Sequence, residues 1–136
     1  MREGRRRILT YGTFDLLHVG HVRLLERAAA LGDELIVGVS TDDFNAVKGK
    51  RTYYSYQDRA EIVAALRCVD EVIPETCWEQ KTDDIHRLTI DVLVMGSDWE
   101  GDERFESLRD QCELIFLPRT EGISTTSIKD DLSKGA

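Results

Sequence analysis

Two histidines, His18 and His21, stand three residues apart between a short apolar run, residues 8–10, and a helical pattern. This order predicts a strand, a loop and the N-terminus of a helix. Free backbone N–H groups and the positive end of the helix dipole meet at such a terminus and form an anion site. Gly12 and Gly20 have no Cβ, so we expect a phosphate to approach the backbone closely there. Each imidazole can donate a hydrogen bond, or a charge when protonated, to phosphate oxygens.

Basic residues gather at two further places, residues 48–51 and Arg119. The whole chain is acidic, with 18 basic and 26 acidic residues and a net charge of −8. That balance argues against general nucleic-acid binding, which needs a basic surface. A local basic cluster can still reverse the field inside one cleft, so a nucleotide remains a suitable ligand.

These residue types suit the transfer of a nucleotidyl group from a nucleoside triphosphate to a second phosphate. Such a nucleophile is already ionised at neutral pH, so the protein needs no general base. It must hold two polyanions in line and neutralise the charge that grows in the transition state. Two histidines at this spacing can also bind a metal, but no third ligand follows at a suitable spacing, so we predict no protein metal site. No nucleophile–base–acid triad is supported.

Five segments carry a resemblance to a known family. They are Gly12-Thr13-Phe14-Asp15, His18-Val19-Gly20-His21, Trp78-Glu79-Gln80-Lys81, Met95-Gly96-Ser97-Asp98-Trp99 and Arg119-Thr120-Glu121-Gly122-Ile123-Ser124-Thr125-Thr126. In this order they resemble the glycerol-3-phosphate cytidylyltransferases of the nucleotidyltransferase superfamily, whose signatures are HxGH and RTEGIST. The resemblance extends from Ile8 to about Leu132, and residues 101–107 are longer and more charged than in that family.

The resemblance implies an enzyme that converts CTP and sn-glycerol 3-phosphate to CDP-glycerol and pyrophosphate, for the synthesis of teichoic acid or a related polymer or lipid precursor. It implies Mg²⁺ bound mainly through the CTP phosphates, a homodimer and a cytoplasmic location. Two alternatives stay open: a nucleotidyltransferase of the same fold that uses another phosphorylated acceptor or ATP, and a nucleotide-binding protein without catalysis. The histidine pair and both lysines speak against the second alternative.

The resemblance also implies roles for individual residues. Catalytic roles fall to His18, His21, Lys48, Lys50 and Arg119. Nucleotide contacts come from Thr13, Phe14, His18, His21, Lys50, Asp98, Arg119, Thr120, Glu121, Gly122, Ile123, Ser124, Thr125 and Thr126. Contacts with the acceptor substrate come from Lys48, Trp78 and Lys81. Asp15 helps to hold the loop, and Arg67 and Asp70 match positions of the active site or the dimer. Taken alone, Trp78 suits a core position equally well, and residues 124–126 suit a simple N-cap.

Strands and helices alternate along the chain. Strands are predicted at residues 8–11, 34–40, 71–74, 91–95 and 113–117, and helices at 22–31, 55–67, 83–88 and from 124 onward, with Ile128 and Leu132 buried. Residues 42–54 are predicted as a loop with a short helical turn, and residues 77–81 as a loop. Alternation predicts an α/β fold with a parallel sheet and helices on both faces. Ligands then lie beyond the carboxyl ends of the strands, where the motifs converge. The resemblance implies a Rossmann-like sheet of five strands in the order 3-2-1-4-5, and no GxGxxG follows a strand, which argues against a dehydrogenase.

The composition of the chain limits the number of domains and the cellular location that we expect. With 136 residues, 41% of them hydrophobic and 32% charged, the chain is predicted to form a single domain over residues 1–136, with residues 1–6 as a flexible basic N-terminus. No apolar run is long enough for a membrane span, and the N-terminus lacks the apolar segment of a signal peptide, so neither membrane insertion nor export is expected. The three cysteines, Cys68, Cys77 and Cys112, include no CxxC pair and fit a reducing compartment.

Overall fold

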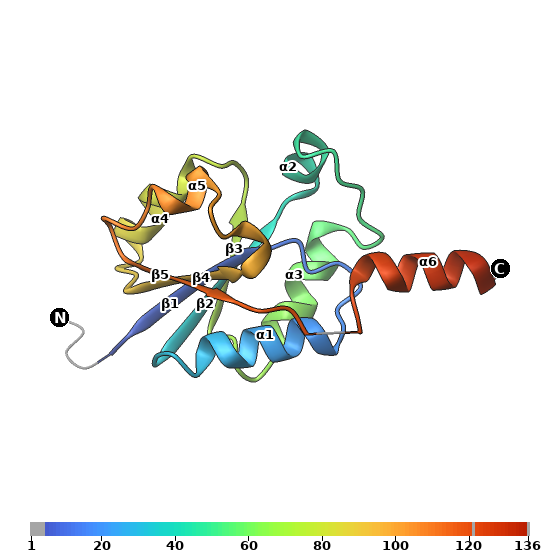
Figure 1. The fold of residues 1–136 in the computed structure, drawn as a ribbon, viewed down its shortest axis with the longest axis horizontal. Coiled ribbons are helices and arrows are strands. Elements are labelled where there is room, and N and C mark those ends of the chain that lie inside the picture. The colour runs from blue at the N-terminus through green and yellow to red at the C-terminus, as the bar shows by residue number, and fades with distance from the viewer. Residues whose placement is uncertain (1–4, 121, 136) are drawn as a thin grey trace.

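A five-stranded parallel sheet forms the centre of the molecule (Figure 1) in the computed structural model, which describes residues 5–120 and 122–135. Its order is β3-β2-β1-β4-β5, and each neighbouring pair is parallel. The strands are β1 (Arg7–Gly12), β2 (Glu34–Ser40), β3 (Glu71–Glu75), β4 (Val92–Gly96) and β5 (Glu113–Leu117). The predicted fold class and strand order are confirmed.

Helices lie on both faces of this sheet. They are α1 (Val19–Ala29), α2 (Asp42–Val47), α3 (Tyr56–Ala64), α4 (Gln80–Arg87), the 3₁₀ turn η1 (Ser97–Trp99), α5 (Glu103–Glu106) and α6 (Thr125–Gly135). In Figure 1, α1 and α3 cover one face, α4 and α5 cover the other, and α6 extends away from the body. Among the described residues, no helix is long and apolar enough to cross a membrane.

Alternating side chains divide the core into two apolar clusters, one on each face of the sheet. Ile8, Leu35 and Val92 pack with Leu25 of α1 and Val63 of α3. Their chain neighbours Leu9, Ile36 and Leu93 pack on the opposite face with Ile85 of α4, with Leu88 directly after α4 and with Phe105 of α5. Each such side chain contributes about 1.5–3 kcal/mol when it is fully buried. Burial on both faces therefore explains why the strands read as continuous apolar runs.

Element boundaries differ from the predicted ones at several helices. Helix α1 begins three residues earlier than predicted, at Val19, because the side chain of His18 caps it. Helix α3 ends at Ala64, and α2 fills the first part of the predicted loop, with the Thr41 hydroxyl accepting the N–H of Phe44. The prediction of a loop through Lys81 is wrong, because α4 already begins at Gln80.

Two further expectations concern the ends of the chain. Arg6 donates its N–H to Asp33 at 2.6 Å and its guanidinium to Glu113 at 2.6 Å, so contacts to the body of the protein hold this residue in place. Residues 1–4 lie outside the described residues. The prediction that Leu132 is buried is wrong in this chain, because α6 projects from the body and leaves the side chain 66% exposed.

Candidate active site

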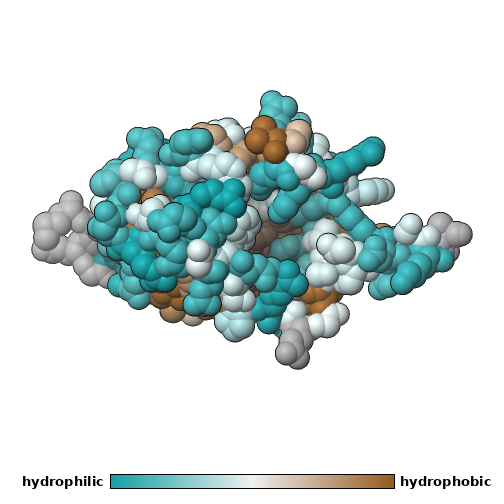
Figure 2. Space-filling view, turned by 45° about the horizontal axis from the view of Figure 1, so that its top comes forward, coloured by the Kyte–Doolittle hydropathy of each residue, from teal (hydrophilic) through white to brown (hydrophobic). Residues whose placement is uncertain are grey.

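A cleft of about 460 Å³ opens at the carboxyl edge of the sheet, and Figure 2 shows a hollow in a largely hydrophilic surface. Its volume lies within the range of small-molecule sites, about 300–1,000 Å³. The predicted site residues that line it are Thr13, Phe14, His18, His21, Lys48, Lys50, Trp78, Asp98, Arg119, Thr120, Ile123, Ser124, Thr125 and Thr126. Lys81 and Gly122 are not among the lining residues, and Glu121 lies outside the described residues.

The two histidines fix each other at the start of α1. Nδ1 of His18 accepts the N–H of Gly20 at 3.0 Å, and Nδ1 of His21 accepts the N–H of His18 at 3.1 Å. The two rings stack with their centroids 3.9 Å apart. Because each Nδ1 is an acceptor, the proton of each neutral ring lies on Nε2. Both imidazoles therefore offer an Nε2–H donor to a ligand in the cleft.

Burial also decides the charge of these rings. It lowers the pKa of His18, and together with the neighbouring His18 it lowers the pKa of His21 to about 4. Both rings are therefore neutral at pH 7 in the free protein. Of the two roles that the sequence allowed, a hydrogen-bond donor or a charge, the neutral rings suit the first, and they can act as preorganised dipoles.

Glycines in this loop make room for rings rather than for a ligand. A Cβ on Gly12 would lie 2.7 Å from the ring of Phe14, and a Cβ on Gly20 would lie 2.8 Å from the ring of His18. The loop also holds two non-glycine residues in the left-handed region, Phe14 with φ 54° and Leu16 with φ 47°. Such conformations cost about 1–2 kcal/mol each and persist only where the surroundings hold them.

Asp15 supplies that support. Its carboxylate is 3% exposed and accepts the N–H groups of Tyr53 at 2.7 Å and Tyr54 at 3.0 Å. Lys129 of α6 pairs with it at 3.2 Å, and Thr125 donates its hydroxyl to the Asp15 carbonyl at 2.8 Å. Burial alone would raise the pKa of Asp15, but these N–H donors and the lysine hold it below its usual value. Asp15 therefore joins the histidine loop to residues 53–54 and to α6.

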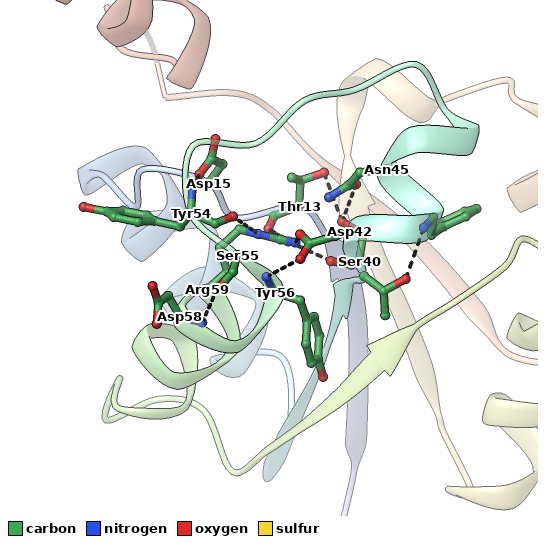
Figure 3. A network of polar contacts seen from close by, with 12 residues as sticks. Thr13, Asp15, Ser40, Asp42, Asn45, Tyr54, Ser55, Tyr56, Asp58 and Arg59 are labelled. Atoms are coloured by element: carbon green, nitrogen blue, oxygen red, sulfur yellow. Dashed lines mark hydrogen bonds and ion pairs between the residues drawn. The ribbon is translucent and has the colours of Figure 1, made fainter.

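Arg59 is a second organiser, which the sequence analysis missed (Figure 3). Its side chain is fully buried and donates to the carbonyls of Thr13 at 2.8 Å, Ser40 at 2.7 Å and Tyr54 at 3.0 Å. The guanidinium also pairs with Asp42 at 2.8 Å. The end of β2 and the loops that carry Thr13 and Tyr54 thus meet on one side chain. The available signal was the position of Arg59 four residues before the apolar Val63, which places both side chains on the same face of the helix.

One side of the cleft is built from the segments that follow β4 and β5. Arg119 donates from Nε to Asp98 at 2.8 Å, so the predicted nucleotide residues of two loops are joined. At the start of α6, Ser124 and Ser127 cap each other through hydroxyl and N–H groups at 3.0 and 3.1 Å. Lys129, one turn further along α6, lines the same side and was also missed. We call these segments, together with the histidine loop, the motif side.

The opposite side is built from lysines and aromatic rings. The Lys48 ammonium lies 4.5 Å from the ring centre of Phe44 and 5.8 Å from that of Trp78. Burial lowers the pKa of Lys48 to about 8, although Glu75 opposes the shift. The guanidinium of Arg104 stacks on the ring of Trp78, 3.8 Å from the ring centre. We call these residues, with Glu75 and Lys81, the aromatic side.

Lys81 lies behind the aromatic rings of this side and does not line the cleft. Its side chain is 2% exposed, and its ammonium bonds the carboxylate of Glu75 at 2.7 Å. Arg67 and Asp70 lie outside the cleft: Asp70 accepts the N–H of Leu35 at the other end of β2. An active-site position for this pair is therefore not supported.

Carboxylates near the cleft are already engaged. Asp15, Glu75 and Asp98 each face a cation of the chain. In the part of the chain that the structure describes, no group of three or more His, Cys, Asp or Glu side chains is arranged to hold a metal ion.

Comparison with known proteins agrees with this geometry. The chain matches the family described as cytidylyltransferase-like over residues 9–131. It is 59% identical to the glycerol-3-phosphate cytidylyltransferase of Bacillus subtilis (strain 168) over 128 residues, covering 94% of this chain and 98% of that protein. It is 55% identical over 127 residues to the glycerol-3-phosphate cytidylyltransferase of Staphylococcus aureus (strain NCTC 8325 / PS 47), covering 93% and 95%. A crystal structure of the lipopolysaccharide core biosynthesis protein from Thermoplasma volcanium GSS1 has a TM-score of 0.76, with 24% identity over 87% of this chain and 100% of that one, and supports the fold alone.

Proposed function

This chain belongs to the cytidylyltransferase-like family, and we propose that it transfers the cytidylyl group of CTP to sn-glycerol 3-phosphate, giving CDP-glycerol and pyrophosphate. Relatives at 59% and 55% identity over nearly the whole chain carry that activity in their names. The observation that supports it most is the cleft itself. Two neutral imidazole donors, three lysines (Lys48, Lys50 and Lys129) and two arginines (Arg51 and Arg119) line one hollow, and this is what the joining of two polyanions requires.

In the reaction, an oxygen of the acceptor phosphate attacks the α-phosphorus of CTP. A new P–O bond forms, the bond between the α-phosphorus and the bridging oxygen breaks, and pyrophosphate leaves with that electron pair. The attacking phosphate is ionised at neutral pH, so no side chain has to remove a proton. The Nε2–H donors of His18 and His21 stabilise the charge that grows on the α-phosphate oxygens, at the centre of the sheet.

Each substrate has its own side of the cleft. The triphosphate and cytidine lie on the motif side, where Arg119 and the N-terminus of α6 offer donors to phosphate and nucleoside. The acceptor lies on the aromatic side, with its phosphate at Lys48 and Lys50. In-line attack then needs the acceptor phosphate to reach the α-phosphate beside His18, which lies between the two sides.

Mg²⁺ is the metal that such a triphosphate carries, because it binds with few protein oxygens and several phosphate and water oxygens. The cleft fits this arrangement, since its carboxylates already pair with cations of the chain. When bound, the ion neutralises charge on the triphosphate and on the leaving pyrophosphate. Turnover should stop when a chelator removes free Mg²⁺ and return when Mg²⁺ is restored; full turnover in excess chelator would contradict this assignment.

The working form is a homodimer in the cytoplasm, where CTP is available, and CDP-glycerol serves teichoic acid or a related polymer. The assignment of a homodimer is carried over from the family resemblance. Sedimentation at micromolar concentration should give twice the chain mass. A fully active species with the mass of one chain would count against the dimer.

A pyrophosphate-release assay over a panel of substrates tests the reaction. We expect release with CTP and glycerol 3-phosphate together, formation of CDP-glycerol in equal amount, and little release when either substrate is omitted. Preference for ATP or for another phosphorylated acceptor would favour a different enzyme of the same fold. Nucleotide binding without release in any combination would mean a protein that binds nucleotide and does not catalyse.

A further inference from the structure

Glu75 places a negative charge in the wall of a cleft that receives two polyanions. It is the last residue of β3, its side chain is 4% exposed, and it lines the cleft. Phosphate groups are repelled by a carboxylate at close range. Glu75 is therefore better suited to face a hydrogen-bond donor of the ligand than one of its phosphate groups.

The charge of Glu75 is balanced from behind. Lys81 bonds Oε2 of the carboxylate at 2.7 Å, and its ammonium is enclosed by the rings of Tyr11 at 4.5 Å, Trp78 at 4.9 Å and Phe105 at 5.4 Å. Lys81 itself does not line the cleft. The carboxylate of the pair therefore faces the cleft, and the ammonium lies behind it among the aromatic rings.

Neighbouring groups leave this carboxylate with unused acceptor capacity. A carboxylate can accept about four hydrogen bonds. Tyr11, which also lines the cleft, donates its hydroxyl to Asp84 at 2.7 Å instead. In the described part of the chain, Lys81 is the side chain that hydrogen-bonds Glu75. A buried ion pair of this kind is a weak source of stability compared with apolar residues of similar volume.

Topology decides which ligand group faces Glu75. Strands β3 and β5 form opposite edges of the sheet, and the nucleotide motif follows β5. Glu75 ends β3, next to Trp78, on the aromatic side. A phosphate acceptor bound there, with its phosphate toward Lys48 and Lys50, extends its other end toward Glu75.

We propose that Glu75 accepts hydrogen bonds from the hydroxyl groups of the acceptor and selects polyol phosphates over phosphates that lack hydroxyls. Lys81 is a positioning residue that holds the carboxylate in place. The inference rests on the proposed function, since it assumes that glycerol 3-phosphate is the acceptor. A site built to bond a substrate hydroxyl rejects the analogue without it, because its buried polar group is then left unpaired.

The test compares glycerol 3-phosphate with propyl phosphate, which has the same phosphate and chain length and no hydroxyl. For the wild-type protein we expect kcat/KM to be at least about a hundredfold higher with glycerol 3-phosphate. Glu75→Leu alone would leave Lys81 buried without its charge partner, so the informative variants are Glu75→Asp and the neutral double variant Glu75→Leu/Lys81→Met, which removes the acceptor oxygens and the buried cation together. Glu75→Asp keeps the charge but withdraws it by one methylene.

In both variants kcat/KM for glycerol 3-phosphate should fall about a hundredfold, whereas the values for propyl phosphate and the KM for CTP should change less than about threefold. Equal losses with both acceptors would assign Glu75 a structural role and overturn the proposal. A change in the preference for CTP over UTP would instead place the base opposite Glu75 and would also overturn it. Wild-type turnover of glycerol 3-phosphate is measured first, and its failure would be a failure of the proposed function alone.

Discussion

The two sides of the cleft, to which we assign the two phosphate-bearing substrates, are built by different physical means. On the motif side, His18 and His21 are neutral and are fixed by hydrogen bonds within four residues of chain. On the aromatic side, Lys48, Glu75 and Lys81 carry charges and are fixed by rings and partners from several elements. Neutral dipoles suit the nucleotide because they favour growing charge without holding the ground state too tightly. Charges suit the acceptor, which has to be captured from water.

Arg59 joins the two sides, so its loss should have the largest effect on the fold. Arg59→Met would leave the carbonyls of Thr13, Ser40 and Tyr54 without their donor. We expect the free energy of unfolding in urea to fall by about 3–5 kcal/mol, with loss of both substrate sites. Arg67→Met, at an exposed arginine just after the same helix, is the matched control and should cost little. A loss below about 0.5 kcal/mol at Arg59 would show that the two sides are held together by other contacts.

Removal of His18 should affect the motif side alone. His18→Ala should lower kcat about a hundred- to thousandfold, because one preorganised donor to the transition state is worth on the order of 3 kcal/mol. It should also cost about 1 kcal/mol of stability, because the ring caps α1. His18→Asn keeps a capping side chain without the Nε2 donor, so it should restore stability and leave kcat low. An unchanged kcat with a raised KM for CTP would make His18 a uniform binding group.

On the aromatic side, the charge of Lys48 should make kcat/KM for glycerol 3-phosphate depend on pH. Burial lowers the pKa of Lys48 to about 8, so the ammonium loses its proton as the pH rises through that value. We expect kcat/KM for glycerol 3-phosphate to fall above pH 8, by about tenfold per pH unit well above it. Lys48→Arg should move this limb to higher pH, because guanidinium stays charged. An unchanged profile in Lys48→Arg would assign the limb to another group; Lys134→Arg, at an exposed position, is the control.

A smaller effect is expected at the outer face of the aromatic wall. Asp102 holds the guanidinium of Arg104 through two side-chain contacts at 3.0 and 2.8 Å, and the guanidinium stacks on Trp78. Arg104→Ala should raise the KM for the acceptor about two- to fivefold, with kcat and the KM for CTP unchanged. Arg109→Ala, which removes a nearby exposed arginine, should change none of these values. If the KM for CTP rises in Arg104→Ala as well, the two sides are not separate at this wall.

The same contrast explains what the sequence could predict. Strands β2 and β5 match their predicted bounds because each is one apolar run between polar residues. The residues of the motif side could be named from the sequence because each of its segments is a short continuous motif that resembles the family, at residues 12–21, 95–99 and 119–126. The start of α1 was missed because histidine is not a usual N-cap. Glu75 was missed because its partner and its enclosing rings come from separate elements, and no local pattern marks a single carboxylate at the end of a strand.

The protonation of the two imidazoles tests the central claim most directly, because the motif side is held to act through neutral Nε2–H donors. Nitrogen-15 NMR of the free protein can report both ring nitrogens of each histidine, with a His86→Asn variant to assign the third ring. At pH 7 we expect the proton of His18 and of His21 on Nε2, a bare Nδ1 in each, and a titration of His21 centred near pH 4. Either ring doubly protonated at pH 7, or protonated on Nδ1 alone, would contradict the claim.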